Sequence, residues 1–186
     1  MDLLEEVGYA SLSIEAVSAR AGVGKPTVYR WWKNKAHLAY AASCSGAAER
    51  NMPATGTFSV DLRTFVLRVA DFYWREGVTA ALRGMLADPE VSQAIQADWV
   101  GPARAYVRRL VEGGRTSGIV RRDADPDALF DLAVGALMLR ALGPPLDAAA
   151  RAQATDAVIE SLLRGFLAPD QNGPLRSDSG GPTANH

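Results

Sequence analysis

The chain has 186 residues, of which 48% are hydrophobic, and its 21 acidic residues nearly cancel its 20 basic ones. This composition supplies enough apolar material for a buried core. The formal net charge of −1 excludes a protein that binds nucleic acid through an overall positive charge. Any nucleic-acid function must therefore depend on charge that is concentrated locally.

The sequence also limits the chemistry and the location of the protein. Cys44 is the only cysteine, which excludes an intramolecular disulfide and a cysteine-based metal cluster. The N-terminus is acidic and lacks the long apolar run of a signal peptide. No segment approaches the roughly 18 consecutive apolar residues of a membrane helix. We therefore expect a cytoplasmic protein without a membrane partner.

The N-terminal part, residues 1–50, is expected to form four helices, three of them very short. Short helices are marginal alone, so they must pack on one another. Ser13 is a good N-cap for the second helix, and Gly22 suits the turn that ends it. Pro26 suits the first turn of the third helix, and Asn34 is placed to cap the fourth.

The rest of the chain also shows helical periodicity and almost no strand signal. Pro102 is expected to kink or split a long helix, and Gly113 and Gly114 are expected to end it. Two further helices are expected over about residues 125–142 and 146–167.

These patterns predict an all-α protein with two domains. The small domain, residues 1–50, contains a helix-turn-helix over about residues 13–32, and the larger helical domain spans residues 57–168. Residues 169–186 are polar and rich in Gly, Pro and Ser, so we expect a disordered tail there.

The helix-turn-helix pattern lies in SIEAVSARAGVGKPTVYRWW, residues 13–32. A short helix, a turn with two glycines and a second short helix are typical of this motif. The first helix braces the second, whose N-terminal part enters the major groove of DNA. Ser18 and Ala21 are small enough for the crossing of the two helices. Between Glu15 and Glu49 the chain has five bases and no acid, a charge run that suits either a nucleic-acid partner or simply a solvated face.

Helical periodicity separates the two faces of the second helix, with Val28 and Trp32 turned toward the core. Arg30 is the best candidate for a bidentate contact to guanine, and the flanking lysines suit phosphates. Trp31 suits either a contact to the DNA backbone or simple packing. The candidate DNA-binding residues are Ser13, Lys25, Thr27, Tyr29, Arg30, Trp31, Lys33 and Lys35.

The run GVGKPTVYRWWKNKAHL resembles the recognition segment of the TetR family of bacterial transcriptional regulators. The residues that match in place are Gly22, Val23, Thr27, Val28, Tyr29, Trp32 and Lys35. The upstream GYASLSIEAVSARAG is also similar, with Ser13 where threonine is common. The sequence departs from the family at Trp31, where histidine or tyrosine is common. Its first helix is also shorter at its start than is usual in the family.

Residues 119–142, IVRRDADPDALFDLAVGALMLRAL, resemble the part of the family that leads into the first of two dimer helices. The resemblance implies a homodimer formed through the last two helices and a small-molecule site in the larger domain. The expected interface residues are Leu129, Ala133, Ala136, Ala150, Ala154, Val158, Ser161 and Gly165. The expected pocket residues, for which ordinary core packing is the competing interpretation, are Phe65, Phe72, Trp99, Tyr106, Phe130 and Leu137.

The resemblance thus implies a repressor that binds a pseudo-palindromic operator in double-stranded DNA and leaves it when an unidentified small-molecule effector binds. An activator, or a helical small-molecule binder that has lost DNA binding, are the alternatives. We expect neither an enzyme nor a cofactor or metal, because the larger domain has no histidine before the tail and no nucleophile, phosphate-loop or metal-ligand motif.

Overall fold

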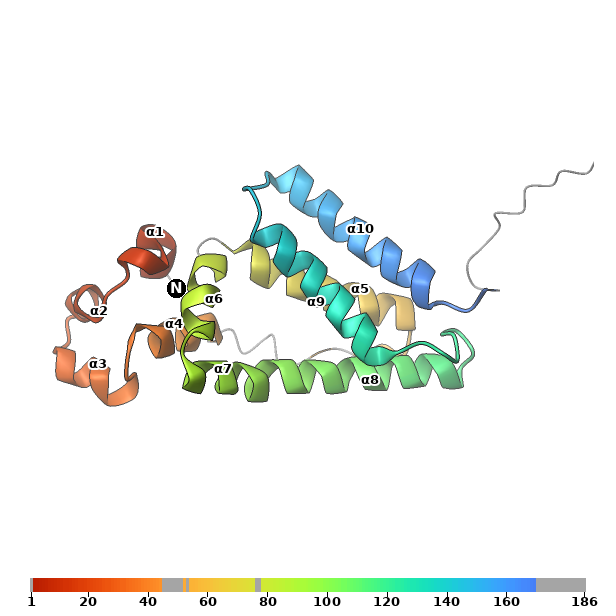
Figure 1. The fold of residues 1–186 in the computed structure, drawn as a ribbon, viewed down its shortest axis with the longest axis horizontal. Helices are drawn as coiled ribbons and strands as arrows, with labels where there is room; N and C mark the ends of the chain where they lie inside the picture. Colours follow the sequence, from red (N-terminus) through yellow and green to blue (C-terminus); the bar gives the residue numbers. More distant parts are fainter. Residues whose placement is uncertain (1, 45–51, 53, 76–77, 170–186) are drawn as a thin grey trace, which may run out of the picture.

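A computed structural model of the chain describes residues 2–44, 52, 54–75 and 78–169 (Figure 1). Within these residues the secondary structure is helical, apart from an isolated antiparallel bridge between Val120 and Leu167. The helices are α1 (Asp2–Ser11), α2 (Ile14–Ala21), α3 (Lys25–Trp31), α4 (Lys35–Cys44), α5 (Phe58–Trp74), α6 (Val78–Leu86), α7 (Pro89–Ile95), a π-helical segment (Gln96–Val100), α8 (Gly101–Thr116), α9 (Pro126–Ala141) and α10 (Ala148–Phe166).

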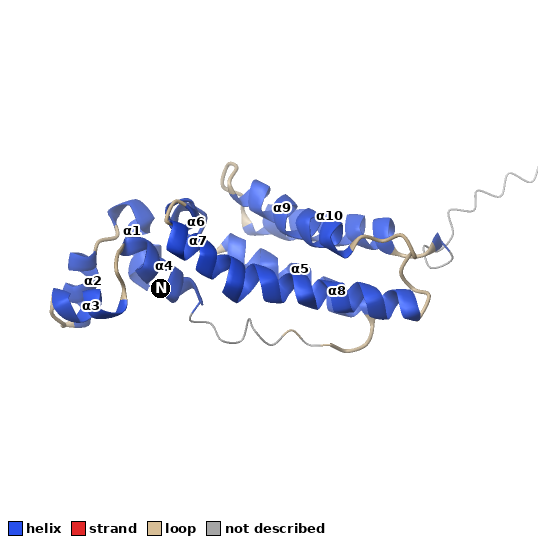
Figure 2. Ribbon diagram, turned by 60° about the horizontal axis from the view of Figure 1, so that its bottom comes forward, coloured by secondary structure: helices blue, strands red, loops and turns tan. Residues whose placement is uncertain are grey.

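The short helices α1–α4 gather at one end of an elongated molecule, and the longer helices form its body (Figure 1). Helices α7 and α8 run end to end along the molecule, while α9 and α10 pack against each other on one side of it (Figure 2). The predicted all-α class is therefore confirmed. The predicted disordered tail lies outside the described residues, except for its first residue.

The helix-turn-helix segment has a small apolar cluster of its own. Ile14, Val28 and Leu38 are buried in it, and Val17 and Trp32 pack against it half-buried. Each of the three helices α2, α3 and α4 contributes one of the buried residues. Because seven- and eight-residue helices are marginal alone, this cluster is what holds α3 in place on α2 and α4.

The main core joins the two parts of the chain. Its centre is Phe65 on α5, whose ring lies 6.1 Å from the ring centroids of both Tyr106 and Phe130. Leu12 and Ala36, from the N-terminal part, are buried in the same cluster. Helices α1 and α4 also both pack on α6, so the N-terminal part is not joined to the body of the molecule by a linker alone.

The long helix predicted around Pro102 is interrupted as expected. The chain adopts a π-helical turn over Gln96–Val100, and α8 then begins at Gly101 with Pro102 in its first turn. A proline removes one backbone donor and crowds the preceding turn, and a π-helical turn is a common way to accommodate such an interruption.

The predicted helix end at Gly113 and Gly114 is wrong, because α8 continues through both residues to Thr116. The chain turns instead at Gly118, which has a positive φ of 73°. Gly114 is buried, and a β-carbon there would overlap the side chain of Val120. This glycine is therefore needed for close packing inside the helix and not for ending it.

Candidate nucleic-acid interface

The turn of the helix-turn-helix forms as its residues predict. The Ser13 hydroxyl accepts a hydrogen bond of 3.1 Å from the backbone N–H of Ala16, so it caps α2. Gly22 ends α2 in the left-handed region, with φ 65° and ψ 27°. Ser18 is buried where α2 meets its neighbours, whereas Ala21 is exposed and does not lie at the helix crossing as expected.

The two faces of α3 differ sharply in exposure. Val28 is only 3% exposed, whereas Trp31 is 71% exposed and Tyr29 50% exposed. Thr27 and Arg30 are exposed as well. Within the described part of the chain, none of the four outward side chains makes a hydrogen bond or an ion pair. This row of polar and aromatic groups is therefore available to a partner molecule.

Two of the three lysines in or near α3 are paired with acids. The ammonium of Lys25 lies 2.9 Å from the carboxylate of Glu15 on α2, and this hydrogen bond lowers the pKa of Glu15 below its ordinary value. The ammonium of Lys33 lies 2.6 Å from the carboxylate of Glu90, which belongs to α7 in the body of the molecule. Both pairs are exposed to solvent, where ion pairs are weak and exchange readily.

Lys35 is held differently, by α1. Its ammonium donates to the backbone carbonyls of Tyr9 at 2.9 Å and Ala10 at 3.3 Å, and it lies 4.5 Å from the centroid of the Tyr9 ring. The same ring packs on Gly84 of α6, where a β-carbon would overlap it. Lys35 thus braces the contact between α1, α4 and α6, and its predicted phosphate contact stays a prediction.

A polar joint between α4 and α7 was not foreseen from the sequence. Asn34 caps α4 by accepting a hydrogen bond from the His37 N–H at 3.0 Å. Asp88 caps α7 by accepting from the N–H groups of Glu90 at 3.0 Å and Val91 at 3.2 Å. The two caps are themselves joined, because the Asn34 amide donates to the Asp88 carboxylate at 2.7 Å. This bond is the main reason that the pKa of Asp88 lies below its ordinary value.

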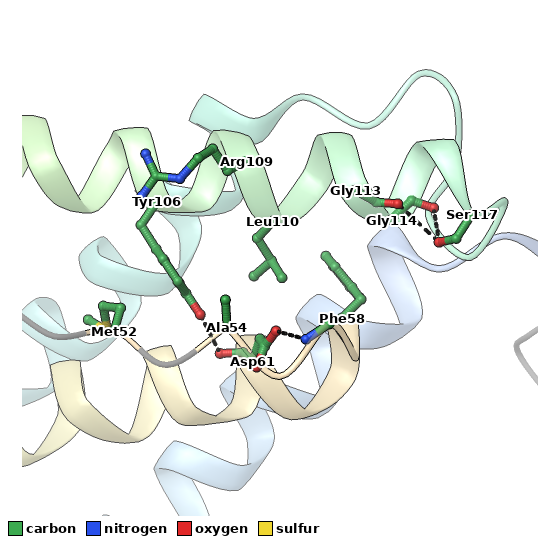
Figure 3. A pocket seen from close by; sticks show the side chains of 11 residues that line it. Met52, Ala54, Phe58, Asp61, Tyr106, Arg109, Leu110, Gly113, Gly114 and Ser117 are labelled. Carbon is green, nitrogen blue, oxygen red and sulfur yellow. Dashed lines mark hydrogen bonds between the residues drawn. The ribbon is translucent and has the colours of Figure 1, made fainter.

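The body of the molecule contains a cavity of about 280 Å³ between α8, the start of α5 and the segment before it (Figure 3). At one side the buried carboxylate of Asp61 accepts hydrogen bonds from the Thr55 N–H at 2.9 Å, the Thr55 hydroxyl at 2.7 Å and the Gly56 N–H at 3.2 Å. The Tyr106 hydroxyl donates to the Asp61 carbonyl at 3.5 Å, and burial raises the pKa of Tyr106. The lining also includes Met52, Phe58, Arg109 and Leu110.

Of the residues expected to line a pocket, Tyr106 lines this cavity. Phe72 and Trp99 stack with ring centroids 6.2 Å apart and border a cleft of about 10 Å³. That volume is barely enough for one water molecule. Three of the expected residues are core residues with less than a twentieth of their surface exposed: Phe65, Phe130 and Leu137.

The residues expected at a dimer interface divide into two groups. Four of them are already buried within the single chain, and their place at an interface stays a prediction: Leu129, Ala133, Ala154 and Val158. The other four are half-buried or exposed: Ala136, Ala150, Ser161 and Gly165. The large exposed apolar residues of α9 are instead Leu132 and Leu139, which are 56% and 72% exposed. The periodicity of α9 did not reveal its outer face, because the helix is apolar nearly all round.

A short helix α3 that packs on α2 and exposes its outer face has the arrangement of the helix-turn-helix class of DNA-binding motifs. Residues 1–42 match the family model for bacterial regulatory proteins of the tetR family. Residues 52–158 match the model for the tetracyclin repressor-like C-terminal domain. The chain therefore belongs to the TetR family of transcriptional regulators, as the resemblance in its sequence predicted.

Curated relatives lead to the same family. The chain is 31% identical over 172 residues to an HTH-type transcriptional regulator of Mycobacterium tuberculosis, covering 87% of this chain and 83% of that one. It is 30% identical to the HTH-type transcriptional regulator YdeS of Bacillus subtilis, covering 76% of this chain and 73% of that one. It is 28% identical to a DNA-binding transcriptional repressor TetR of Mycobacteroides abscessus, covering 88% and 90%.

Solved structures share the fold. A TetR-family regulator from Mesorhizobium loti superposes with a TM-score of 0.60 at 19% identity, over 89% of this chain and 91% of that one. A second, from Vibrio parahaemolyticus, has a TM-score of 0.50 at 22% identity, over 90% and 93%. Among the helices of the described residues, none combines the length and apolarity that crossing a bilayer requires.

Proposed function

We propose that this regulator is a repressor that binds a pseudo-palindromic operator as a homodimer and leaves it when a small molecule binds in its body. The observation that carries the DNA-binding part is the outer face of α3, where Tyr29, Arg30 and Trp31 protrude while Val28 anchors the helix. Arg30 offers a guanidinium fork for a guanine edge, and Tyr29 offers a hydroxyl for a phosphate.

The dimer is proposed through the outer faces of α9 and α10. Leu132 and Leu139 are seven residues apart, so they lie on the same side of α9, and both are more than half exposed. Ser161 and Gly165 offer a small, exposed surface on α10 that permits close approach. Such a dimer presents two α3 helices to successive major grooves, about 34 Å apart for half-sites one turn away.

The effector site is proposed in the cavity beside Tyr106. Its volume of about 280 Å³ lies just below the range of about 300–1,000 Å³ that is usual for small-molecule sites. Met52, Phe58 and Leu110 offer an apolar surface, and the Tyr106 hydroxyl offers a polar anchor. An effector that binds better to a dimer with wrongly spaced α3 helices lowers DNA affinity by linkage.

Repression is favoured over activation by the name of one relative, the DNA-binding transcriptional repressor of Mycobacteroides abscessus. A helical small-molecule binder without DNA binding is the alternative from another class. The exposed side chains of Thr27, Tyr29, Arg30 and Trp31, which have no hydrogen-bonding partner among the described residues, favour DNA binding over that alternative, because their polar and aromatic groups suit phosphates and base edges.

A gel shift with the DNA directly upstream of the protein's own gene tests the proposal. We expect a shift that weakens steeply with salt, because phosphate contacts release counterions. Unlabelled DNA of scrambled sequence should compete poorly. If no fragment shifts at low salt, the protein is not a DNA-binding repressor, and the small-molecule binder becomes the better explanation.

A further inference from the structure

The ion pair between Lys33 and Glu90 connects the DNA-binding end with the body of the molecule. Lys33 follows α3 by two residues, and its ammonium lies 2.6 Å from the Glu90 carboxylate in the first turn of α7. Their side chains remain 69% and 60% exposed, so the pair is open to competition from another anion. A DNA phosphate is such an anion, and a lysine beside a recognition helix is a usual contact for it.

From this geometry we propose that Glu90 weakens DNA binding by holding Lys33 away from the phosphate backbone. The proposal rests on the DNA-binding role of the α3 end. In the DNA-free protein Lys33 already has an acidic partner, so a phosphate gains this lysine only by displacing Glu90. Glu90 is thus an additional residue that sets DNA affinity, although it lies outside the helix-turn-helix.

The surroundings of Glu90 keep its carboxylate where it meets Lys33. Asp88 caps α7 through the Glu90 and Val91 N–H groups and is bonded to Asn34, the residue after Lys33. The His37 imidazole lies 3.6 Å from the Glu90 carboxylate, on the side of α4. The Glu90 carboxylate therefore lies close to two basic side chains of the DNA-binding end, and the capping bonds of Asp88 fix the backbone that carries it.

Because Glu90 lies in the first turn of α7, the competition depends on how α7 is placed relative to α3. A shift of α7 that separates Glu90 from Lys33 makes the Lys33 ammonium available to DNA. A shift that tightens the pair makes this ammonium less available. The body of the molecule can therefore change DNA affinity through one side chain without deforming α3.

The test measures binding to a fluorescent duplex of random sequence, about three helical turns long, at several salt concentrations. Non-specific binding depends on phosphate contacts alone, so no operator is needed. The proteins are the full-length chain, Glu90→Gln, Lys33→Ala and the double variant. Glu112→Gln is the matched control, because Glu112 is an exposed acid that pairs with Arg115 near the end of α8.

We expect Glu90→Gln to raise affinity by about twofold to fivefold for each subunit bound, the range of an exposed ion pair. The dependence of log K on log salt should steepen by about 0.9 for each lysine that gains a phosphate. Glu112→Gln should change neither quantity. In the Lys33→Ala background Glu90→Gln should have no effect, because the cation that it releases is absent.

An equal gain from Glu90→Gln with and without Lys33 would overturn the inference, since it would show a general effect of removing an acid near DNA. No gain in either background would overturn it as well. If the unmodified chain bound no duplex at low salt, the proposed function would fail and the inference with it. That outcome differs from one in which the chain binds DNA with an affinity that Glu90→Gln leaves unchanged.

Discussion

The side chains of Asn34 and Asp88 each cap a helix and are hydrogen-bonded to each other at 2.7 Å. Asn34 caps α4 at the DNA-binding end, and Asp88 caps α7 in the body. The positive N-terminal end of α7 therefore lies at the Asp88 carboxylate, which is favourable for its negative charge. The DNA-binding end is thus held to the body through helix ends whose backbone groups would otherwise be unsatisfied.

Replacing Asn34 with alanine should destabilise the protein by about 1 kcal/mol or more, because α4 loses its cap and Asp88 loses its donor. Urea unfolding followed by tryptophan fluorescence measures this loss. Asp88→Ala completes a double-mutant cycle. The stability losses of the two single variants should sum to more than the loss of the double variant, because each single variant already removes the hydrogen bond between Asn34 and Asp88.

The matched control for this cycle is Asp147→Ala. Asp147 caps α10 through the Ala150 N–H at 2.8 Å and has no partner at the DNA-binding end among the described residues. Its loss should add independently to that of Asn34→Ala. Additive losses for Asn34 and Asp88 as well would show that their bond contributes nothing.

The joint should also respond to pH in a defined direction. The Asn34 bond lowers the pKa of Asp88 in the folded protein, so its carboxylate stabilises the fold above the ordinary value of about 3.9. That stabilisation is lost as the pH falls through the lowered pKa. The unmodified chain should therefore have a larger free energy of unfolding than Asp88→Asn at about pH 5, and this difference should shrink as the pH is lowered further. Urea titrations at several pH values measure it. A difference that stays constant or grows would contradict the role of this carboxylate.

Two adjacent glycines in α8 should respond in opposite directions to alanine. Gly113 has open space where a β-carbon would lie, so Gly113→Ala should stabilise the protein by up to about 1 kcal/mol through helix propensity. Gly114→Ala should destabilise it, because the new methyl group would overlap Val120. Thermal unfolding of the two variants measures both effects. Similar shifts for both would mean that α8 does not pass Val120 as described.

The proposed dimer predicts that a charge on the outer face of α9 separates the subunits. Leu139→Glu should sediment at half the mass of the unmodified chain in analytical ultracentrifugation, because it would bury a carboxylate in an apolar contact. Leu86→Glu is the control, since Leu86 is an exposed apolar residue at the end of α6. If Leu86→Glu dissociates the dimer and Leu139→Glu does not, the subunits meet through another surface.

The helix-turn-helix was predictable because its signals are local. Ser13, Gly22 and Pro26 each act on backbone groups within a few residues, and the faces of α3 follow from helical periodicity. The joint of Asn34 with Asp88 was not predictable, although both residues are recognisable as caps. Their bond joins residues 54 positions apart, and helix signals contain no information about which helix ends meet.

The body of the molecule shows the same limit. Its aromatic residues were expected either to line a pocket or to fill the core, and composition does not separate the two uses. Phe65 fills the core, whereas Tyr106 reaches the cavity, because their places depend on how α5 and α8 pack. Gly114 looked like a helix end for a similar reason, since only the packing of Val120 shows why a glycine is needed there.

The role of α3 in reading DNA is tested by the binding of the unmodified chain and Arg30→Ala to the operator and to a scrambled duplex, followed by fluorescence anisotropy. We expect Arg30→Ala to lose about 1–3 kcal/mol on the operator and to lose its preference for the operator over the scrambled duplex. Lys25→Ala, which removes a proposed phosphate contact, should weaken both complexes alike. An Arg30→Ala variant that keeps the full preference would contradict the assignment of α3 as the helix that reads the bases.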